Sequence, residues 1–226
     1  MLKEQLLQNR QNNFFFLLAA LLFLLIILPV ITDIYGEKNW LIGHLTFSVT
    51  LIFSVLSLSK AKKWRNTGII LVLLGIVFSA LAFYHKNNFF LCLSLIADFL
   101  FILLIISMAL QQVIFSDRVN LHNIAGAACV YLLLGIIWAL VYYFISIIMP
   151  GAFKGNISVD IQLQTNDFVY YSFVTLSTLG YGDILPVAAT AKSLAYIEAI
   201  FGQFYLAILV AGLVSIHIST RLKESQ

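Results

Sequence analysis

Charged residues are scarce in this chain, and their scarcity excludes most classes of water-soluble protein. Of the 226 residues, only 10% are Asp, Glu, Lys or Arg, whereas 62% are hydrophobic. Soluble domains usually carry about 25% charged residues, because their surfaces must be solvated. The composition therefore predicts an integral membrane protein.

Cysteine and histidine are also rare, which removes several kinds of chemistry. Cys92 and Cys129 both fall inside apolar stretches, so a disulfide framework or a thiolate metal site is not expected. No cluster of His, Cys and carboxylates has the spacing of metal ligands, and no nucleophile stands beside a base. We therefore expect neither an enzyme nor a bound cofactor. The net charge of +3 does not indicate nucleic acid, because the basic residues gather at the ends of apolar stretches.

Six apolar stretches are long enough to cross the hydrocarbon core of a bilayer, which takes about 20 residues as a helix. They are Phe14–Ile31, Trp40–Ser59, Gly68–Tyr84, Phe89–Phe115, Ile124–Met149 and Ser193–Ile218. The first has the position of a signal peptide, but its apolar run is long and no Ala-x-Ala site follows it, so an uncleaved span is favoured. The sequence thus predicts an all-α, multi-pass membrane protein.

The basic residues favour an orientation with both termini in the cytoplasm. In that orientation nine of the thirteen lie in inner segments, and the other four, Lys38, Lys86, Lys154 and Lys192, lie outside. The cluster Lys60–Arg65 is the strongest single indication. We expect a cell-membrane location, of the bacterial inner-membrane type, with the segment between the fifth and sixth spans facing outward.

A short glycine-containing motif lies between the last two spans. Residues 175–183 read Thr-Leu-Ser-Thr-Leu-Gly-Tyr-Gly-Asp. A filter that replaces the water shell of an ion with backbone carbonyls needs dihedrals that alternate between ordinary and left-handed, and Gly180 and Gly182 tolerate the latter. Thr178 can add a hydroxyl, and Tyr181 can brace the outer end. Gly-Tyr-Gly alone is also a common tight turn, but the flanking residues and spans favour a filter.

The outward-facing segment before this motif divides into two parts. Pro150–Gln164 is polar and contains turn-forming residues, so it predicts an exposed loop, the turret. Thr165 or Asn166 can then cap a short helix that runs to about Ser177. Roughly eleven residues reach only about 16 Å, so this helix would enter the membrane halfway. Its C-terminal end would carry a partial negative charge near the membrane centre, which favours a cation there.

The motif Thr175–Asp183 resembles the signature of the potassium-channel superfamily, and residues 120–218 resemble the pore module of small bacterial potassium channels. The layout of six spans and one pore loop is similar to that of voltage-gated and cyclic-nucleotide-gated relatives. The resemblance implies a homotetramer in membrane lipid that conducts K⁺ passively. Residues 1–119 would form a peripheral four-span domain, and residues 120–226 the pore domain. One pore loop per chain supplies one quarter of a carbonyl ring.

The same resemblance assigns the ion ligands. K⁺ would bind the backbone carbonyls of Thr178, Leu179, Gly180 and Tyr181 and the hydroxyl of Thr178, in a filter that ends at Gly182. Leu179 replaces the valine that is commoner in the family. Its carbonyl, rather than its side chain, would face the ion.

Residues around the filter also correspond to positions in the family. Tyr170 and Tyr171 stand where an aromatic pair packs around the filter, and Asp183 stands where an aspartate anchors its outer mouth. Gly202 lies twenty residues beyond Gly182, at the spacing of the hinge glycine of the inner helix. A lone glycine in a membrane helix is also a common packing contact, so both interpretations of Gly202 remain open.

Glu198 and Asp98 are acids inside predicted spans, where an isolated carboxylate is costly. We interpret Glu198 as a hydrogen-bonded support for the pore helix, the short helix that runs to about Ser177. The alternatives are a proton-sensitive gate element and a neutral side chain bonded to a neighbouring hydroxyl. Asp98 is the sole ionisable residue of Phe89–Phe115, which lacks the arginines of voltage sensors. Without those arginines we expect little voltage sensitivity. Because the chain ends at Gln226, we also expect no cytoplasmic regulatory domain.

Two other functions fit part of the sequence. Some potassium uptake transporters descend from channel pores, but they usually fuse four pore repeats in one chain, whereas this chain has one. A regulatory subunit that joins other pore chains would not need an intact filter motif. A potassium-selective channel subunit is therefore the leading hypothesis.

Overall fold

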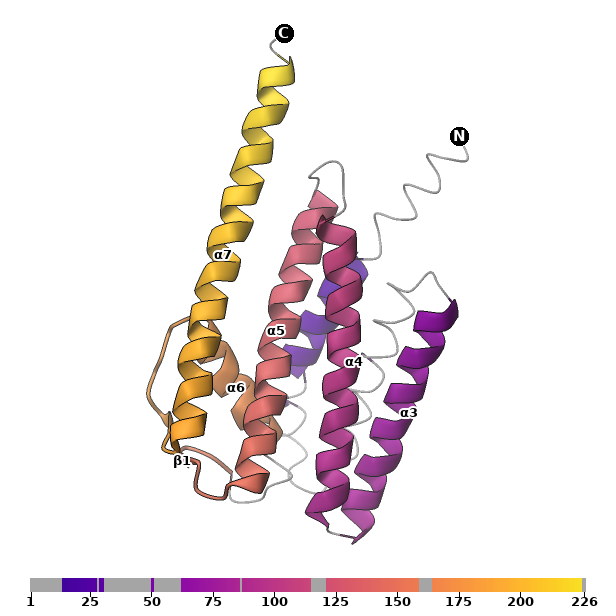
Figure 1. Ribbon diagram of the computed structural model, residues 1–226, viewed down its shortest axis with the longest axis vertical. Coiled ribbons are helices and arrows are strands. Elements are labelled where there is room, and N and C mark those ends of the chain that lie inside the picture. The colour runs from indigo at the N-terminus through magenta and orange to yellow at the C-terminus, as the bar shows by residue number, and fades with distance from the viewer. Residues whose placement is uncertain are drawn as a thin grey trace.

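A computed structural model describes residues 14–27, 29–30, 50, 62–85, 87–114, 121–158 and 164–224. An apolar helix, Phe14–Ile27, comes first in the chain. The labelled elements that follow it are α3 (Lys62–His85), α4 (Asn88–Ile114), α5 (Leu121–Ile148), β1 (Phe153–Gly155), α6 (Gln164–Leu176), β2 (Ile184–Pro186) and α7 (Ala189–Glu224) (Figure 1). The described chain is therefore almost entirely helical, as the composition predicted.

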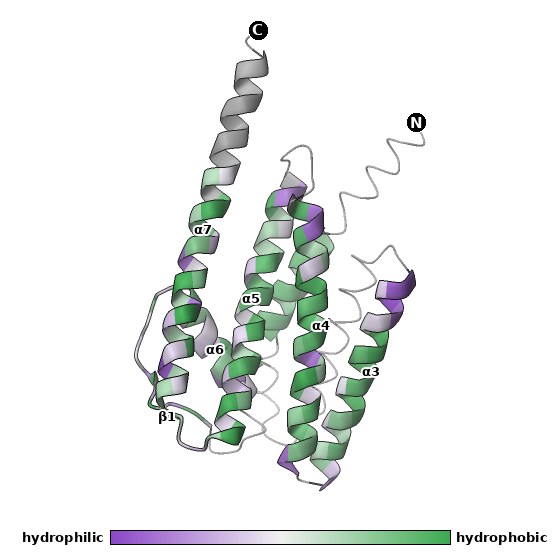
Figure 2. Ribbon diagram, viewed as in Figure 1, coloured by the Kyte–Doolittle hydropathy of each residue, from purple (hydrophilic) through white to green (hydrophobic). Residues whose placement is uncertain are grey.

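Among the described residues, three helices are long and apolar enough to cross a membrane: Lys62–His85, Asn88–Val113 and His122–Ile148. They cover the third predicted span and all but the last residues of the fourth and fifth, and Figure 2 shows hydrophobic residues along most of their length. The predicted span Ser193–Ile218 falls within α7, and the first predicted span contains the shorter helix Phe14–Ile27. Two predictions lie outside the described residues. One is the span Trp40–Ser59, of which only Thr50 is described, and the other is the domain boundary near residue 119.

Small residues bring α3 and α4 together. The buried residues of α3 recur every three or four positions and are mostly small: Gly68, Val72, Gly75, Ser79 and Ala82. Helices in lipid gain little from hydrophobicity, so close backbone packing over small residues stabilises their association. The carboxylate of Asp98, on α4, lies directly over Gly75; a Cβ added there would come within 2.8 Å of its Oδ1. Asp98 therefore packs inside this helix pair.

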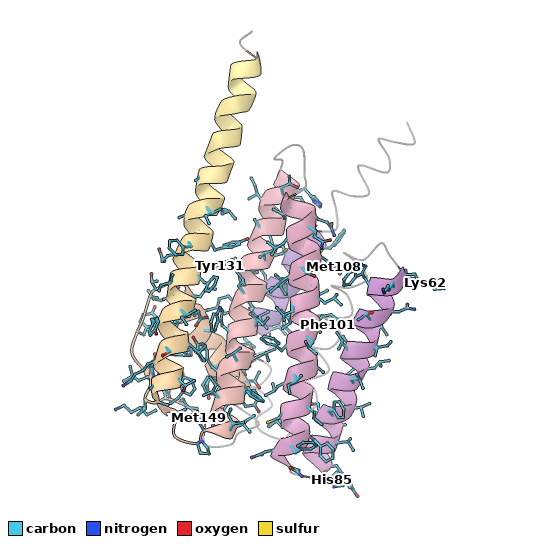
Figure 3. All side chains as sticks on the ribbon, in the orientation of Figure 1. Lys62, His85, Phe101, Met108, Tyr131 and Met149 are labelled. Carbon is cyan, nitrogen blue, oxygen red and sulfur yellow. The ribbon has the colours of Figure 1, made fainter. Side chains whose placement is uncertain are left out.

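Helix α5 occupies the middle of the molecule. It packs against α4 on one side and against α6 and α7 on the other. At its first turns, the ring of Phe14 lies 4.8 Å from that of His122. Tyr131, on the side of α5 that faces α7 (Figure 3), lies 5.9 Å from the ring of Tyr205, whose hydroxyl donates to the Ala127 carbonyl at 2.6 Å. The two contacts of Tyr205 hold α7 against α5 at a level that α6 does not contact.

Helix α6 is the short helix predicted before the glycine motif. It starts beside the last turn of α5, where Ser146 Oγ donates to Gln164 Oε1 at 3.0 Å. It then runs back along α5 and ends next to α7, and with 13 residues it is less than half as long as either helix (Figure 1). Its first turn is bonded to the preceding loop, because Ser158 N donates to Asp167 Oδ2 at 2.7 Å. With 13 residues, α6 is too short to cross a bilayer, which takes about 20 residues as a helix.

The turret prediction was wrong over part of its length. Instead of an exposed loop, Phe153–Gly155 forms β1, which pairs antiparallel with β2, the segment just after the glycine motif. The residue pairs are Phe153 with Pro186, Lys154 with Leu185, and Gly155 with Ile184. Ala152 is 3% exposed and Phe153 is 9% exposed. The strand is held in place because the Phe153 ring is buried among other aromatic rings. The local sequence does not predict this burial, because the other rings come from distant segments.

Candidate functional site

The backbone of the glycine motif alternates between left-handed and ordinary dihedrals. Thr178, Gly180 and Gly182 have φ values of 59°, 58° and 79°, whereas Leu179 and Tyr181 between them do not enter the left-handed region. The sequence predicted the two glycines, which adopt this conformation at little cost. It missed Thr178, although Thr178 precedes Gly180 by the two residues that a strict alternation requires.

Thr178 is strained in this position. A left-handed φ is uncommon for a β-branched residue, and such strain costs on the order of 1–3 kcal/mol. Two hydrogen bonds of its hydroxyl hold it: Oγ1 donates to the Ser177 carbonyl at 2.7 Å and accepts from Gln203 Nε2 at 3.2 Å. Strain of this size persists where the surrounding structure imposes it, which is typical of functional sites. Gln203, on α7, was not among the predicted site residues.

The inner N–H groups of the motif donate to carbonyls at the end of α6. Leu179 N and Gly180 N donate to the Val174 carbonyl at 2.9 and 3.2 Å, and Thr178 N donates to the Thr175 carbonyl at 2.9 Å. These bonds anchor the start of the motif to the last turn of α6. Within the described part of the chain, the carbonyls from Thr178 to Gly182 accept no hydrogen bond. Unpaired carbonyls in a row suit the replacement of a cation's water shell.

Two contacts hold the outer end of the motif at Asp183. Tyr170 OH, on α6, donates to Asp183 Oδ2 at 2.7 Å. A tyrosine phenol is protonated at neutral pH, so Tyr170 is the donor of this bond and the Asp183 carboxylate is the acceptor. From the other side, Asn156 N donates to the Asp183 carbonyl at 2.9 Å. The first contact joins two predicted residues, and the second involves a residue that sequence reasoning missed.

Tyr171 points away from Asp183, into an aromatic cluster. Its ring lies 4.9 Å from that of Tyr142 on α5 and 5.6 Å from that of Phe153 on β1. The Phe153 ring lies 5.0 Å from Phe168, the fourth member of the cluster. Tyr170 and Tyr171 therefore do different things: Tyr170 bonds the outer end of the motif, and Tyr171 ties α6 to α5 and β1.

Glu198 joins three helices from a fully buried position, with 0% of its surface exposed. Tyr142 OH, on α5, lies 2.5 Å from Glu198 Oε2, and Ser172 Oγ, on α6, lies 2.5 Å from Oε1. Ser172 Oγ also lies 2.7 Å from the Gly135 carbonyl. Ser172 has one hydroxyl proton, so both of its hydrogen bonds form when it donates to the Gly135 carbonyl and accepts a hydrogen bond from the protonated carboxyl group of Glu198. A neutral Glu198 thus satisfies every partner.

Gly202 lies where α7 crosses the end of α6. A Cβ added to Gly202 would overlap the carbonyl oxygen of Leu176, the last residue of α6. The absence of a side chain therefore lets α7 support the end of α6 directly, which is the packing interpretation of this glycine. Its role as a hinge stays a prediction.

The motif lies on the surface of the single chain. All residues from Ser177 to Asp183 are exposed, including Leu179 at 56% and Tyr181 at 68%. The neighbouring face of α7 also exposes large apolar side chains, among them Tyr196, Ile200, Phe201, Phe204 and Ile208. One chain alone therefore does not enclose the carbonyls.

Residues 130–218, from α5 through the motif into α7, match the family model described as "Ion channel". Every site residue described above lies inside this match. The same segment contains the alternating backbone, both contacts at Asp183 and the buried Glu198 network.

The curated relatives are potassium channels from a plant and a virus. "Two-pore potassium channel 4" of Arabidopsis thaliana is 37% identical over 102 residues, 44% of this chain and 35% of that protein. "Two-pore potassium channel 5" of the same plant is 41% identical over 49 residues, 22% of this chain and 12% of that protein. "Potassium channel protein kcv" of Paramecium bursaria Chlorella virus 1 is 40% identical over 57 residues, 23% of this chain and 61% of that protein.

The matches thus span less than two thirds of each of these relatives. No solved structure matches this chain. The family match therefore concerns the segment from α5 to α7, and helices α3 and α4 lie outside it.

Proposed function

We propose that this chain is the pore-forming subunit of a potassium-selective channel that conducts K⁺ passively. The observation that carries the proposal is the alternation of left-handed and ordinary dihedrals from Thr178 to Gly182, with carbonyls that accept no hydrogen bond in the described chain. The ion would bind the carbonyls of Thr178, Leu179, Gly180 and Tyr181 and the Thr178 hydroxyl. The similarity of residues 130–218 to ion channels, and of shorter segments to potassium channels, supports the same assignment.

The active unit is a homotetramer with six spans per chain and four motifs around one axis. The exposure of Leu179 and Tyr181 supports this assembly, because both would otherwise meet lipid or water. The apolar face of α7 would become the wall of the inner pore and the contact with neighbouring chains. A dehydrated ion needs oxygens on all sides, and one chain offers one row.

The termini would lie in the cytoplasm. Lys62 begins α3, whereas His85, at the other end of α3, lies at the same end of the molecule as Met149 (Figure 3). Lys63 and Arg65 follow Lys62 in the first turns of the same helix. The positive-inside rule then assigns that end to the cytoplasm, so that the motif opens toward the outside.

A flux assay on the purified full-length chain in liposomes tests this function. Vesicles loaded with K⁺ and placed in Na⁺ should lose K⁺ through the protein, and vesicles with the reverse gradient should not lose Na⁺. Ba²⁺, which matches K⁺ in size but carries twice the charge, should block the flux. The mass of the detergent-solubilised complex should correspond to four chains. Equal K⁺ and Na⁺ fluxes, no flux, or a complex of other than four chains would contradict the proposal.

A further inference from the structure

We propose that Gly155 and Asn156, at the end of β1, position the outer end of the filter and so help determine its ion selectivity without touching the ion. We call the contacts of Gly155 and Asn156 with Asp183 the outer clamp. The inference rests on the proposed function, because it concerns the same filter. It adds a selectivity determinant outside the motif itself, in a segment that the sequence marks only as a turret.

The fit between Gly155 and Asp183 leaves no room for a side chain. Gly155 has a φ of 116°, a conformation that L residues rarely adopt, and a Cβ there would overlap the Asp183 carbonyl oxygen. That close approach brings Asn156 N to 2.9 Å from the same oxygen. Glycine is therefore required twice at this position, for its backbone conformation and for the space.

The strand that carries the clamp is fixed to the body of the protein. Phe153 packs in the aromatic cluster of α5 and α6, with rings 5.0 Å from Phe168 and 5.7 Å from Tyr142. Next to it, the Ala152 carbonyl accepts from Val187 N at 2.8 Å and from Ala188 N at 3.2 Å. The outer clamp is therefore connected through β1 to α5 and α6, so that a displacement of β1 would also displace the outer end of the filter.

The two ends of the filter are held in different ways. Backbone bonds to Val174 fix the inner end, whereas Asp183, directly after Gly182, is held by the Tyr170 hydroxyl on its side chain and by the clamp on its backbone. Selectivity for K⁺ depends on the number and arrangement of the carbonyls around the ion. Displacement of the Asp183 carbonyl shifts the adjoining Gly182, so loss of the clamp should loosen the outermost ion site first.

The test compares Gly155→Ala with Gly151→Ala in planar bilayers that contain the purified full-length protein. Gly151 is a matched control, because it has a φ of 85° in the same loop and an added Cβ there meets nothing within 4 Å. Both variants carry the strain of a left-handed alanine, but only Gly155→Ala disturbs Asp183. The permeability to Na⁺ relative to K⁺, from the reversal potential, should rise about tenfold in Gly155→Ala and stay at the wild-type value in Gly151→Ala. A tenfold change corresponds to about 1.4 kcal/mol of lost discrimination.

A milder pair of variants covers the case in which Gly155→Ala does not assemble. Phe153→Leu loosens the anchor of β1 without touching the filter, and Lys154→Ala changes an exposed side chain on the same strand. Relative Na⁺ permeability should rise in Phe153→Leu, by less than in Gly155→Ala, and remain unchanged in Lys154→Ala.

Three results separate the possible failures. Wild-type selectivity in an assembled Gly155→Ala, or in Phe153→Leu, would overturn the clamp. The same change in Gly151→Ala as in Gly155→Ala would do so too, because it would assign the effect to strain in the loop. A wild-type protein that conducts without K⁺ selectivity would instead contradict the proposed function, before any variant is measured.

Discussion

Glu198 lies on α7, and its side chain forms hydrogen bonds with both α5 and α6. Replacement of Glu198 by alanine removes these bonds. The two lost contacts are those to Tyr142 OH and Ser172 Oγ, each 2.5 Å long and fully buried. Hydrogen bonds between membrane helices contribute about 0.6 kcal/mol on average and up to about 1.7 kcal/mol. Glu198→Ala should therefore cost about 1–3 kcal/mol per chain, before any cost of the cavity left behind. Because about 1.4 kcal/mol is a factor of ten, the unfolded fraction of each chain should rise roughly fivefold to 150-fold.

Glutamine at the same position is the matched control. It has the shape of a neutral glutamic acid, its amide oxygen can accept from Tyr142, and its NH₂ group can donate to Ser172. Glu198→Gln should therefore stay close to wild type. Removal of one partner at a time, by Ser172→Ala or Tyr142→Phe, should give an intermediate loss.

Denaturant titration of the purified complex, with K⁺ flux at a series of pH values, measures both effects. The reasoning predicts the order of stability wild type, Gln, then Ala, with the same pH profile for wild type and Gln. Equal stability of the Ala and Gln variants would refute the support role of Glu198. A changed pH profile in Gln, together with a robust Ala variant, would favour a proton-sensitive gate instead.

Three further predictions concern the filter, the inner helix and voltage. Gly182→Ala should abolish K⁺ flux, because a Cβ opposes its φ of 79°; a tetrameric variant with normal flux would refute the filter assignment. Gly202→Ala should destabilise the complex by about 1–3 kcal/mol, as overpacking does, because its Cβ would overlap Leu176; an equally stable variant with altered opening alone would favour the hinge. Current between roughly −100 and +100 mV should depend little on voltage, since Phe89–Phe115 has no Lys or Arg and Asp98 packs over Gly75; a steep sigmoidal curve for every permeant ion would reveal a sensor.

Features that depend on neighbouring residues could be predicted from the sequence. The left-handed glycines follow from the motif alone, and the short helix α6 follows from its length between the turret and the motif. The family resemblance assigned both Tyr170 and Asp183 to the surroundings of the filter, and the contact that the structure forms between them spans only thirteen residues. The buried position of Glu198 followed from its place in an apolar span.

Contacts between distant segments could not be predicted in the same way. Tyr142 and Glu198 are 56 residues apart, and nothing in a membrane helix distinguishes one tyrosine as a partner. Strand β1 has three residues, too few to show an alternating pattern, and its burial depends on an aromatic cluster built by other elements. The strain at Thr178 runs against the preference of its side chain, so local propensity indicates the opposite conformation.

The reversal potential of the wild-type protein, with K⁺ on one side of a bilayer and an equal concentration of Na⁺ on the other, tests the central claim most directly. A ring of unpaired carbonyls from Thr178 to Tyr181 predicts that current at zero voltage is carried by K⁺. The reversal potential should then shift with each change of K⁺ concentration as the K⁺ equilibrium potential does. A reversal potential near zero, unchanged when K⁺ is exchanged for Na⁺, would contradict the account.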